Sequence, residues 1–411
     1  MNKELNRRIF FTIQILILAR LGIFIPIVGI NHDSFYRSVD PVSLFNLLNV
    51  FSGGGLSTIG VFALGIAPYI NSSIIVQLCT KVFPKLEDWQ TNEGEIGRQK
   101  LTQLIRFLTL GWSIIQSLVV AFWIRPYVFN WNIVYVINTV FSLTAGSMII
   151  LWLGEMITQK GIGNGTSMLV CQNIIAAMPL QIYNSVQSSD TVFMWMKILI
   201  TVLLFFIIII FSIFLQEGTH RVPIISIKQL SLSINSININ YIPLKLNHGN
   251  IMPIIFASGT IAILGNVLQF ILGEKLKRFP SHTTSYLYLI FYCIFIILFS
   301  YFYSLLTRNP KDISKTLKAQ GVSVIGIKPG EVTTKYLEKI LNKLIFLGAV
   351  FLFLLAIIPY VTSLITQIDA FKGFGVTSLM ILVGATIDIS KQLRTYEISK
   401  TYDDMINKNE Q

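Results

Sequence analysis

The sequence predicts an all-α polytopic membrane protein with ten transmembrane helices, and three observations support that prediction. Of the 411 residues, 53% are hydrophobic and only 13% are charged, whereas a soluble protein carries about 25% charged residues. Apolar runs with few charges recur along the chain at close to the ~20 residues that a helix needs to cross a bilayer. Lysine and arginine concentrate in alternate loops between these runs, as is typical of membrane proteins with a fixed orientation.

The ten predicted spans follow one another along the whole chain. The first has the basic start of a signal peptide, but no small-residue cleavage pattern follows it, so we expect it to be retained as a span. Residues 51–62 are too short to be a span of their own. The predicted spans are 9–28, 64–83, 104–124, 133–157, 166–182, 193–215, 251–272, 285–306, 344–362 and 374–391.

The loops between the spans predict their orientation. With the N-terminus on the cytoplasmic or stromal side, the loops and tails on that side hold 23 Lys and Arg residues, and the opposite loops hold 6. Positive residues are enriched on the cytoplasmic side of membrane proteins. Both termini, including the tail at 392–411, are therefore expected to face that side.

The order of the spans suggests two halves of five helices each. Residues 1–182 would form the N-terminal half and residues 193–391 the C-terminal half, joined by a polar hinge loop at 183–192. An odd number of spans in each half gives the halves opposite topology, as in inverted-repeat transport proteins. The sequence has no clear internal similarity, so the inverted repeat follows from topology alone.

The stretch 51–84 reads as a membrane segment broken in two. A glycine triplet and Gly60 flank a short apolar piece, and Gly65 and Pro68 open a longer one. Irregular backbone at membrane depth is tolerated only where protein or a water-filled cavity satisfies its polar groups. The break therefore suggests a cavity, although a re-entrant or merely kinked span fits the stretch equally well.

Two loops on the predicted inner side are distinctive. The loop at 217–246 is rich in Ser, Asn and Ile and could form a β-hairpin. The loop at 307–343 is basic and places the turn residues Gly326, Pro329 and Gly330 between two amphipathic pieces. Such a projection suits docking of a soluble partner or of acidic ribosomal RNA. An orientation signal without a partner fits the composition slightly better.

The sequence contains no pattern that predicts catalysis, a metal site or a cofactor. The four histidines lie in loops or at span ends without HExxH spacing, and the three cysteines lie in apolar segments without CxxC spacing. The GIGNG segment at 161–165 lacks the strand-turn-helix context of a phosphate loop, so a tight turn between helices is expected.

The charges inside the spans are few, and they bear on what could pass through the bundle. Arg106, Glu155 and Asp388 lie near the predicted inner ends, where snorkelling or helix capping explains them, and Arg20 lies deeper. A solute transporter is favoured by ten spans and a broken helix, but it would hold polar ligands near the midplane. An apolar constriction instead seals by dewetting and suits a polypeptide conduit.

Several long motifs in this sequence resemble those of the SecY family, the channel subunit of the Sec protein translocase, over essentially the whole chain. The matching stretches are ELNRRIFFTIQILILARLGIFIPIVGI, FSGGGLSTIGVFALGIAPYINSSIIVQL, NEGEIGRQKL, WLGEMITQKGIGNGTS, IPLKLN followed by MPIIFASG, and NPKDISKTLKAQGVSVIGIKPGEVTTKYL. The resemblance implies a SecY-like clamshell of two inverted five-helix halves, with an hourglass pore, a short plug helix and a lateral gate.

The resemblance also implies a function and a set of site residues. The protein would pass unfolded polypeptides across the membrane and release hydrophobic segments into lipid, with no catalytic activity and no cofactor. The implied pore ring consists of Ile66, Ile70, Val170, Ile174, Ile255 and Ile381. The implied plug, 53–62, consists of Gly53, Gly54, Gly55, Leu56, Ser57, Thr58, Ile59, Gly60, Val61 and Phe62.

By the same resemblance, the expected partners are a SecE-type small subunit, the SecA motor ATPase, a SecG-type subunit, translating ribosomes, signal sequences of client preproteins and membrane lipid. Arg221, Lys228 and Lys328 would contribute to docking of the motor or ribosome. Here GIKPG replaces the GIRPG that is usual in the family, and the loop at 217–246 is contracted. The composition is similar to that of algal plastid members, so a thylakoid membrane is expected, with a bacterial inner membrane as the alternative.

Overall fold

The computed structural model of the chain is predominantly helical and falls into two compact units. Unit 1 comprises residues 1–195 and 367–411, and unit 2 comprises residues 196–366. The structure describes residues 3–31, 59–91, 93–187, 194–226, 240–246, 253–254, 256–257, 260, 281–307, 310–366 and 370–409.

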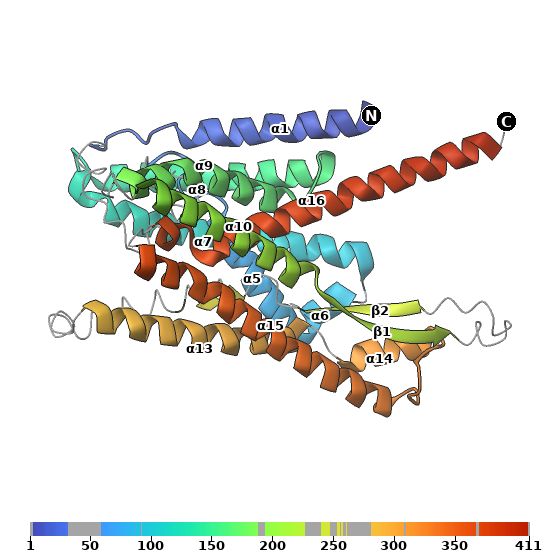
Figure 1. The fold of residues 1–411 in the computed structure, drawn as a ribbon. Coiled ribbons are helices and arrows are strands. Elements are labelled where there is room, and N and C mark those ends of the chain that lie inside the picture. The colour runs from blue at the N-terminus through green and yellow to red at the C-terminus, as the bar shows by residue number, and fades with distance from the viewer. Residues whose placement is uncertain are drawn as a thin grey trace. The chain divides into compact units, whose positions relative to one another are not determined.

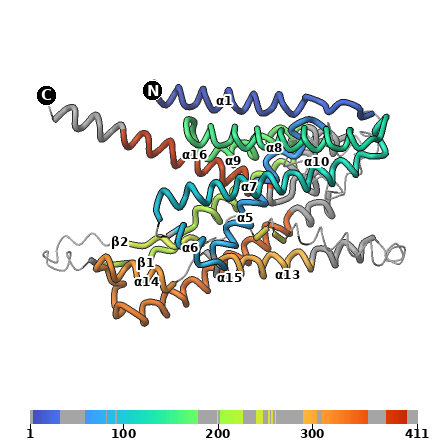
Figure 2. Tube along the Cα trace, turned by 180° about the vertical axis from the view of Figure 1, so that it is seen from behind, coloured from blue at the N-terminus to red at the C-terminus, as the bar shows by residue number. Residues whose placement is uncertain are grey.

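Unit 1 is a bundle of long helices (Figures 1 and 2). Helix α5 packs on α7, α7 on α8, α8 on α9, and α9 on the last helix of the chain, while α1 lies beside α8 and α9. The elements of this unit are α1 (Lys3–Ile23), α5 (Ala67–Val82), α6 (Pro84–Thr91), α7 (Gly94–Trp123), the 3-10 turn η1 (Arg125–Tyr127), α8 (Ile133–Lys160), α9 (Gly165–Gln187) and α16 (Ala370–Asn409).

Several helix ends in unit 1 differ from the predicted span ends. Helix α1 stops at Ile23, before the predicted limit of the first run, because the chain then turns and Pro26 forms a β-bridge with Gly60. Helix α7 begins at Gly94 and α16 continues to Asn409, well outside their apolar runs. Hydropathy marks only the apolar part of a helix, so polar helical extensions escape it.

Unit 2 joins three long helices to a small sheet. Its elements are α10 (Met194–Glu217), β1 (Thr219–Ser226), β2 (Asn240–Lys245), α13 (Ser281–Thr307), α14 (Pro310–Ala319), β3 (Val322–Val324) and α15 (Glu331–Thr366). The strand order is β2-β1-β3, and both pairings are antiparallel. The β-hairpin predicted for 217–246 is confirmed, with Arg221 opposite Pro243. The third strand, which pairs Val324 with Ile224, was not predicted.

The sheet of unit 2 has a hydrophobic core of its own. We call β1 to β3, α14, the turn at 325–330 and residues 331–343 of α15 the sheet module. Its buried apolar side chains come from both strands of the hairpin, from β3 and from both helices, and they are Val222, Leu244, Leu317, Val324, Leu337 and Leu341. The two predicted amphipathic pieces of the 307–343 loop are therefore α14 and the start of α15, packed under the sheet.

Three helices in the described part of the chain are long and apolar enough to cross a membrane by length and composition. They are Gly94–Trp123, Ile133–Lys160 and Glu331–Ile358. Of the predicted span at 251–272, only residues 253–254, 256–257 and 260 are described. The count of ten spans therefore stays a prediction.

Candidate functional site

Of the stretch 51–84, the structure describes residues 59–84, and the predicted break is present there. Residues 59–66 form turns and a β-bridge, and helix α5 begins at Ala67 with Pro68 in its first turn. Gly65 adopts φ +54°, a left-handed conformation that glycine reaches without steric cost. The prediction that Gly65 and Pro68 open a second helix is confirmed.

The irregular segment before α5 is bonded to the irregular segment after α1. The amide of Ile27 donates to the carbonyl of Ile59 (3.1 Å), and the amide of Val61 donates to the carbonyl of Ile25 (2.9 Å). A side chain on Gly60 would overlap the carbonyl of Ile23, so only glycine permits this approach. Backbone groups at Ile59 and Val61, which no helix satisfies, are thus bonded within the protein, as a membrane setting demands.

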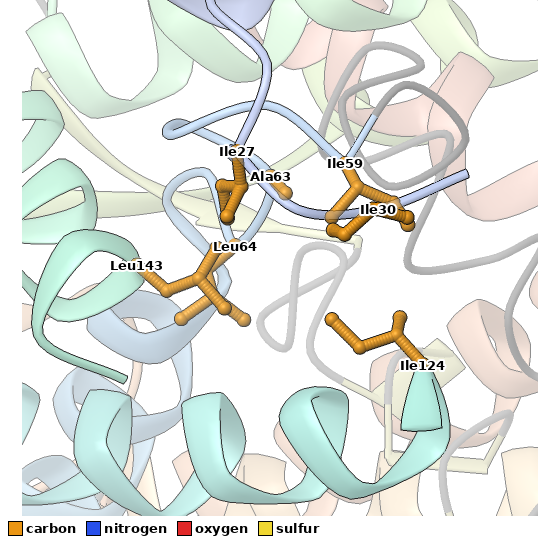
Figure 3. Packing of buried hydrophobic residues seen from close by; sticks show 7 residues of the cluster. All are labelled: Ile27, Ile30, Ile59, Ala63, Leu64, Ile124 and Leu143. Atoms are coloured by element: carbon orange, nitrogen blue, oxygen red, sulfur yellow. The ribbon is translucent and has the colours of Figure 1, made fainter. Parts of the chain in front are cut away.

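A cluster of buried aliphatic side chains fixes these two segments against α7 and α8 (Figure 3). It is built from the stretch after α1, the stretch before α5, the residue after α7, and the middle of α8. Its members are Ile27, Ile30, Ile59, Ala63, Leu64, Ile124 and Leu143. Ile59 is only 1% exposed and is held at φ +45°, which is costly for a β-branched residue.

Five of the six residues of the implied pore ring lie in the described part of the chain, so the structure does not show a complete ring. In unit 1, the buried members are Ile66, Val170, Ile174 and Ile381, and Ile70 is half-buried. Ile66 caps α5, and its carbonyl accepts the amide of Ile70 (3.1 Å), so these two lie one turn apart as predicted. Ile255 lies outside the described residues. The ring therefore stays a prediction.

The implied plug is described only at its C-terminal end. Residues 59–62 are not helical, because their backbone pairs with the segment after α1. Residues 53–58, which would form the body of the plug, lie outside the described residues. A plug helix stays a prediction for residues 53–58, and residues 59–62 are not part of such a helix in this structure.

Two of the three candidate docking residues are described, and both lie on the sheet module. Arg221 is exposed on β1, with its guanidinium 4.8 Å from the ring centre of Tyr241. Lys328 is exposed in a turn in which Gly326 and Gly330 adopt φ of +77° and +116°. Lys228 lies outside the described residues.

The turn that carries Lys328 is fixed from both sides. The hydroxyl of Thr333 donates to the carbonyl of Lys328 (2.8 Å), and the hydroxyl of Ser314 on α14 donates to the carbonyl of Gly330 (3.1 Å). These bonds fix the backbone of the turn, and with it the point from which the Lys328 side chain leaves the sheet module. It suits a residue that contacts a partner.

The GIGNG segment is a tight turn between α8 and α9, as predicted, but sequence reasoning missed its contacts. The amide of Ile162 donates to the hydroxyl of Thr12 on α1 (3.1 Å), and the amide of Gly163 donates to Oε1 of Gln392 on α16 (2.7 Å). The turn therefore ties the first and last helices of the chain to the middle of unit 1. No local signal marks partners so far apart in sequence.

Arg106 and Glu155 form a bidentate ion pair between α7 and α8. Nε and Nη2 of Arg106 lie 2.7 Å from Oε1 and Oε2 of Glu155, respectively. Snorkelling or helix capping was predicted for these two residues, and the structure adds that each is the other's partner. In the described residues, no group of three or more His, Cys, Asp or Glu side chains could hold a metal ion.

This fold defines a class of protein. The chain is similar to a solved protein-conducting channel (TM-score 0.63, 15% identity, 97% of this chain and 94% of the other) and to Sec61 in the canine ribosome–channel complex (TM-score 0.59, 16% identity, 97% and 94%). At these identities the likeness shows the fold alone, which is that of the membrane channels for proteins.

The sequence comparisons are more specific. The SecY family model matches residues 60–390. The SecY translocase subunit of Pyropia yezoensis is 50% identical over 404 residues, 98% of each chain, and that of Porphyra purpurea is 50% identical over 407 residues, again 98% of each. The Synechococcus elongatus protein is 44% identical over 415 residues, 98% of this chain and 94% of the relative. The chain belongs to the SecY family.

Proposed function

We propose that this chain is the protein-conducting subunit of a Sec preprotein translocase. The observation that carries the proposal is the match to the SecY family over nearly the full chain, including relatives named as translocase subunits at 50% identity. The chain passes unfolded polypeptides across the membrane and releases hydrophobic segments into lipid. It performs no catalysis, so energy comes from partners.

The pore is sealed by an apolar ring, formed by Ile66, Ile70, Val170, Ile174, Ile255 and Ile381. An aliphatic ring excludes ions by dewetting and makes no demand on the chemistry of the passing chain. The burial of four of these side chains in unit 1 supports their placement inside the bundle. The plug at 53–62 closes the ring from one side, and its anchored end at residues 59–62 supports a hinge there.

The ten spans form two inverted halves that open like a clamshell. The lateral gate lies between α5 and α7 on one side and the seventh and eighth spans on the other. A hydrophobic segment leaves through this helix-helix seam because Leu and Ile favour lipid by a few tenths of a kcal/mol each. A signal sequence opens the gate by the same preference.

A SecE-type subunit clamps the two halves, and a SecG-type subunit is a further member of the complex. SecA or a translating ribosome docks on the sheet module at Arg221, Lys228 and Lys328. The positive charge and exposure of Arg221 and Lys328 support this assignment. Lysine at position 328 keeps the charge of the family's arginine but loses its bidentate fork. Two solved neighbours are Sec61 in a canine ribosome–channel complex from the endoplasmic reticulum and the yeast Ssh1 complex bound to the 80S ribosome.

The protein spans a thylakoid membrane with both termini in the stroma, or a bacterial inner membrane with both in the cytoplasm. The excess of Lys and Arg in the predicted inner loops supports the orientation. Relatives from both algae and cyanobacteria support these two membranes.

The decisive experiment places a cysteine at the pore ring. In the assembled complex, Ile70→Cys should crosslink to a translocating polypeptide that is stalled halfway. A matched variant, Phe107→Cys, lies on the outward face of α7 with its side chain 78% exposed and should not crosslink. Crosslinking at both positions would remove the ring assignment. Absence of crosslinking at Ile70→Cys in an otherwise active complex would favour a solute transporter.

A further inference from the structure

A hollow of about 410 Å³ lies beside the Arg106–Glu155 ion pair, between α7 and α8 of unit 1. Its volume lies within the roughly 300–1,000 Å³ range of small-molecule pockets. Apart from Arg106, every lining residue comes from one face of α8, at helical spacings of three and four residues. The lining residues are Arg106, Met148, Leu151, Trp152, Glu155, Met156 and Gln159.

The hollow is polar at one end and apolar at the other. Gln159 and Glu155 lie in the last two turns of α8, which ends at Lys160, and Met148 lies three turns earlier, in the middle of the apolar run. At 1.5 Å per residue, Met148 and Gln159 are roughly 16 Å apart along the helix. That gradient matches a lipid lying in its leaflet, with the head group at Gln159 and the acyl chain along Met148.

The charge of the polar end selects among head groups. Glu155 occupies Nε and Nη2 of Arg106 at 2.7 Å, so the pair as a whole is neutral. An anionic phosphate at this site would face the carboxylate as closely as the guanidinium. A head group without net charge avoids that repulsion.

The hydrogen-bonding groups of the polar end include both donors and acceptors. Among the described residues, no protein acceptor is bonded to Nη1 of Arg106, and the amide of Gln159 offers both a donor and an acceptor. Sugar hydroxyls also do both. Trp152, whose side chain is 57% exposed, adds an aromatic surface on which the apolar face of a hexose can pack.

We propose that the groove between α7 and α8 binds a glycosyl diacylglycerol, with its sugar at Arg106, Glu155 and Gln159 and its acyl chain along Met148. The inference goes beyond the proposed function, since it requires only that α7 and α8 span a membrane. A bound lipid would cover the ion pair and join the two helices at the membrane surface.

The first test compares head groups on the assembled, delipidated complex. Monogalactosyl diacylglycerol, phosphatidylethanolamine and phosphatidylglycerol with identical acyl chains are titrated, and the retained lipid is counted by native mass spectrometry. The galactolipid should be held about fivefold more tightly than either phospholipid, because each hydroxyl of a hexose both donates and accepts, whereas the phosphate oxygens of a phospholipid only accept. Equal or tighter retention of either phospholipid would overturn the assignment of a sugar.

The second test uses matched variants. Gln159→Leu should weaken galactolipid retention about fivefold and Trp152→Ala about tenfold. Gln90→Leu on α6 and Trp123→Ala on α7 make the same changes at residues that do not line the hollow and should retain the lipid like the parent protein. If the controls lose as much as the groove variants, the site is elsewhere.

The third test asks what covers the groove in a membrane. A photo-crosslinking residue in place of Met148 should capture lipid in the complete complex. Capture of another subunit would show that a polypeptide covers the groove and would overturn the proposal. None of these outcomes depends on translocation activity, so they leave the proposed function to its own test.

Discussion

Helix α7 of unit 1 and the sheet module of unit 2 distribute their side chains in opposite ways. On α7 the buried positions are small or weakly polar: Thr109, Ser113, Ser117 and Ala121, together with Gly97 near its start. Its bulky apolar residues point outward, and Phe107, Val119 and Phe122 are 78%, 64% and 60% exposed. In the sheet module, Val222 and Leu337 are buried, whereas Arg221 and Lys245 are exposed.

The difference reflects two solvents. In water, burial of apolar surface drives association, so a module that packs like a soluble domain keeps its large aliphatic residues inside. In lipid that drive is absent between helices, and association depends on close packing of small residues and on polar contacts. Ser117 illustrates the second case, since its hydroxyl donates to the carbonyl of Ser113 (2.6 Å) and lies 3.1 Å from Oγ1 of Thr144 on α8.

The largest effect is expected from a cavity in the sheet module. Leu337 is fully buried in its core, so Leu337→Ala should lower the local opening free energy by about 2–5 kcal/mol. Amide hydrogen exchange of β1 and β2 measures that opening. Val332→Ala, on the same helix but 56% exposed, should leave exchange almost unchanged. Parent-like protection in Leu337→Ala would mean that the module is not held by its apolar core.

A larger apolar side chain at the α7 interface of unit 1 should lower the free energy of unfolding. In a soluble core that contains a cavity, the same change would raise it. Ser117→Leu adds apolar surface at a position with no exposed area, and overpacking there should cost about 1–3 kcal/mol. Val119→Leu on the outward face should be nearly neutral. Thermal unfolding in nanodiscs measures both. A stabilised Ser117→Leu would show that the α7 interface is loosely packed.

Sequence reasoning succeeded where the structural signal is local. Gly65 and Pro68 mark the start of α5 within a few residues, and the Ser- and Ile-rich loop marks a hairpin. It failed where partners are distant. The three-residue strand β3 has no pattern of its own and is defined by pairing with β1. Arg106 and Glu155 are 49 residues apart, and only the packing of α7 on α8 brings them together.

The candidate site divides in the same way. The anchors on either side of the break follow from glycine and proline, whose backbone preferences are legible in the sequence. The pore ring came from family resemblance, because an isoleucine that lines a pore and one that packs in a core have the same spacing. The burial of Val170 and Ile174 excludes an outward-facing position but does not distinguish those two roles.

A buried hydrogen bond in unit 1 should be worth less than the aliphatic core of the sheet module. Thr12 is 3% exposed, and Thr12→Val would leave the buried amide of Ile162 without its acceptor, at a cost of about 1–2 kcal/mol. Thr12→Ser keeps the hydroxyl and should be milder. Thermal unfolding compares the two. A parent-like Thr12→Val would show that the hydroxyl of Thr12 contributes nothing, and a larger loss in Thr12→Ser would assign the effect to its methyl group.

The smallest effect should come from the contact with the best geometry. The Arg106–Glu155 pair is bidentate at 2.7 Å, yet the two side chains are 45% and 22% exposed, so screening and side-chain entropy offset much of the attraction. A double-mutant cycle of Arg106→Gln and Glu155→Gln isolates the pair from other contacts of each residue. We expect a coupling of about 0.5–1 kcal/mol in the unfolding free energy.

The size of that coupling discriminates between two kinds of interface. If polar pairs held α7 to α8, the coupling would exceed the cost of Ser117→Leu, and either single variant would separate the helices. If close packing of small residues holds them, the coupling stays small, and the pair instead fixes which turn of α7 faces which turn of α8. The second outcome follows from the burial of Ser113, Ser117 and Ala121, because contacts along this whole face outnumber a single ion pair at its end.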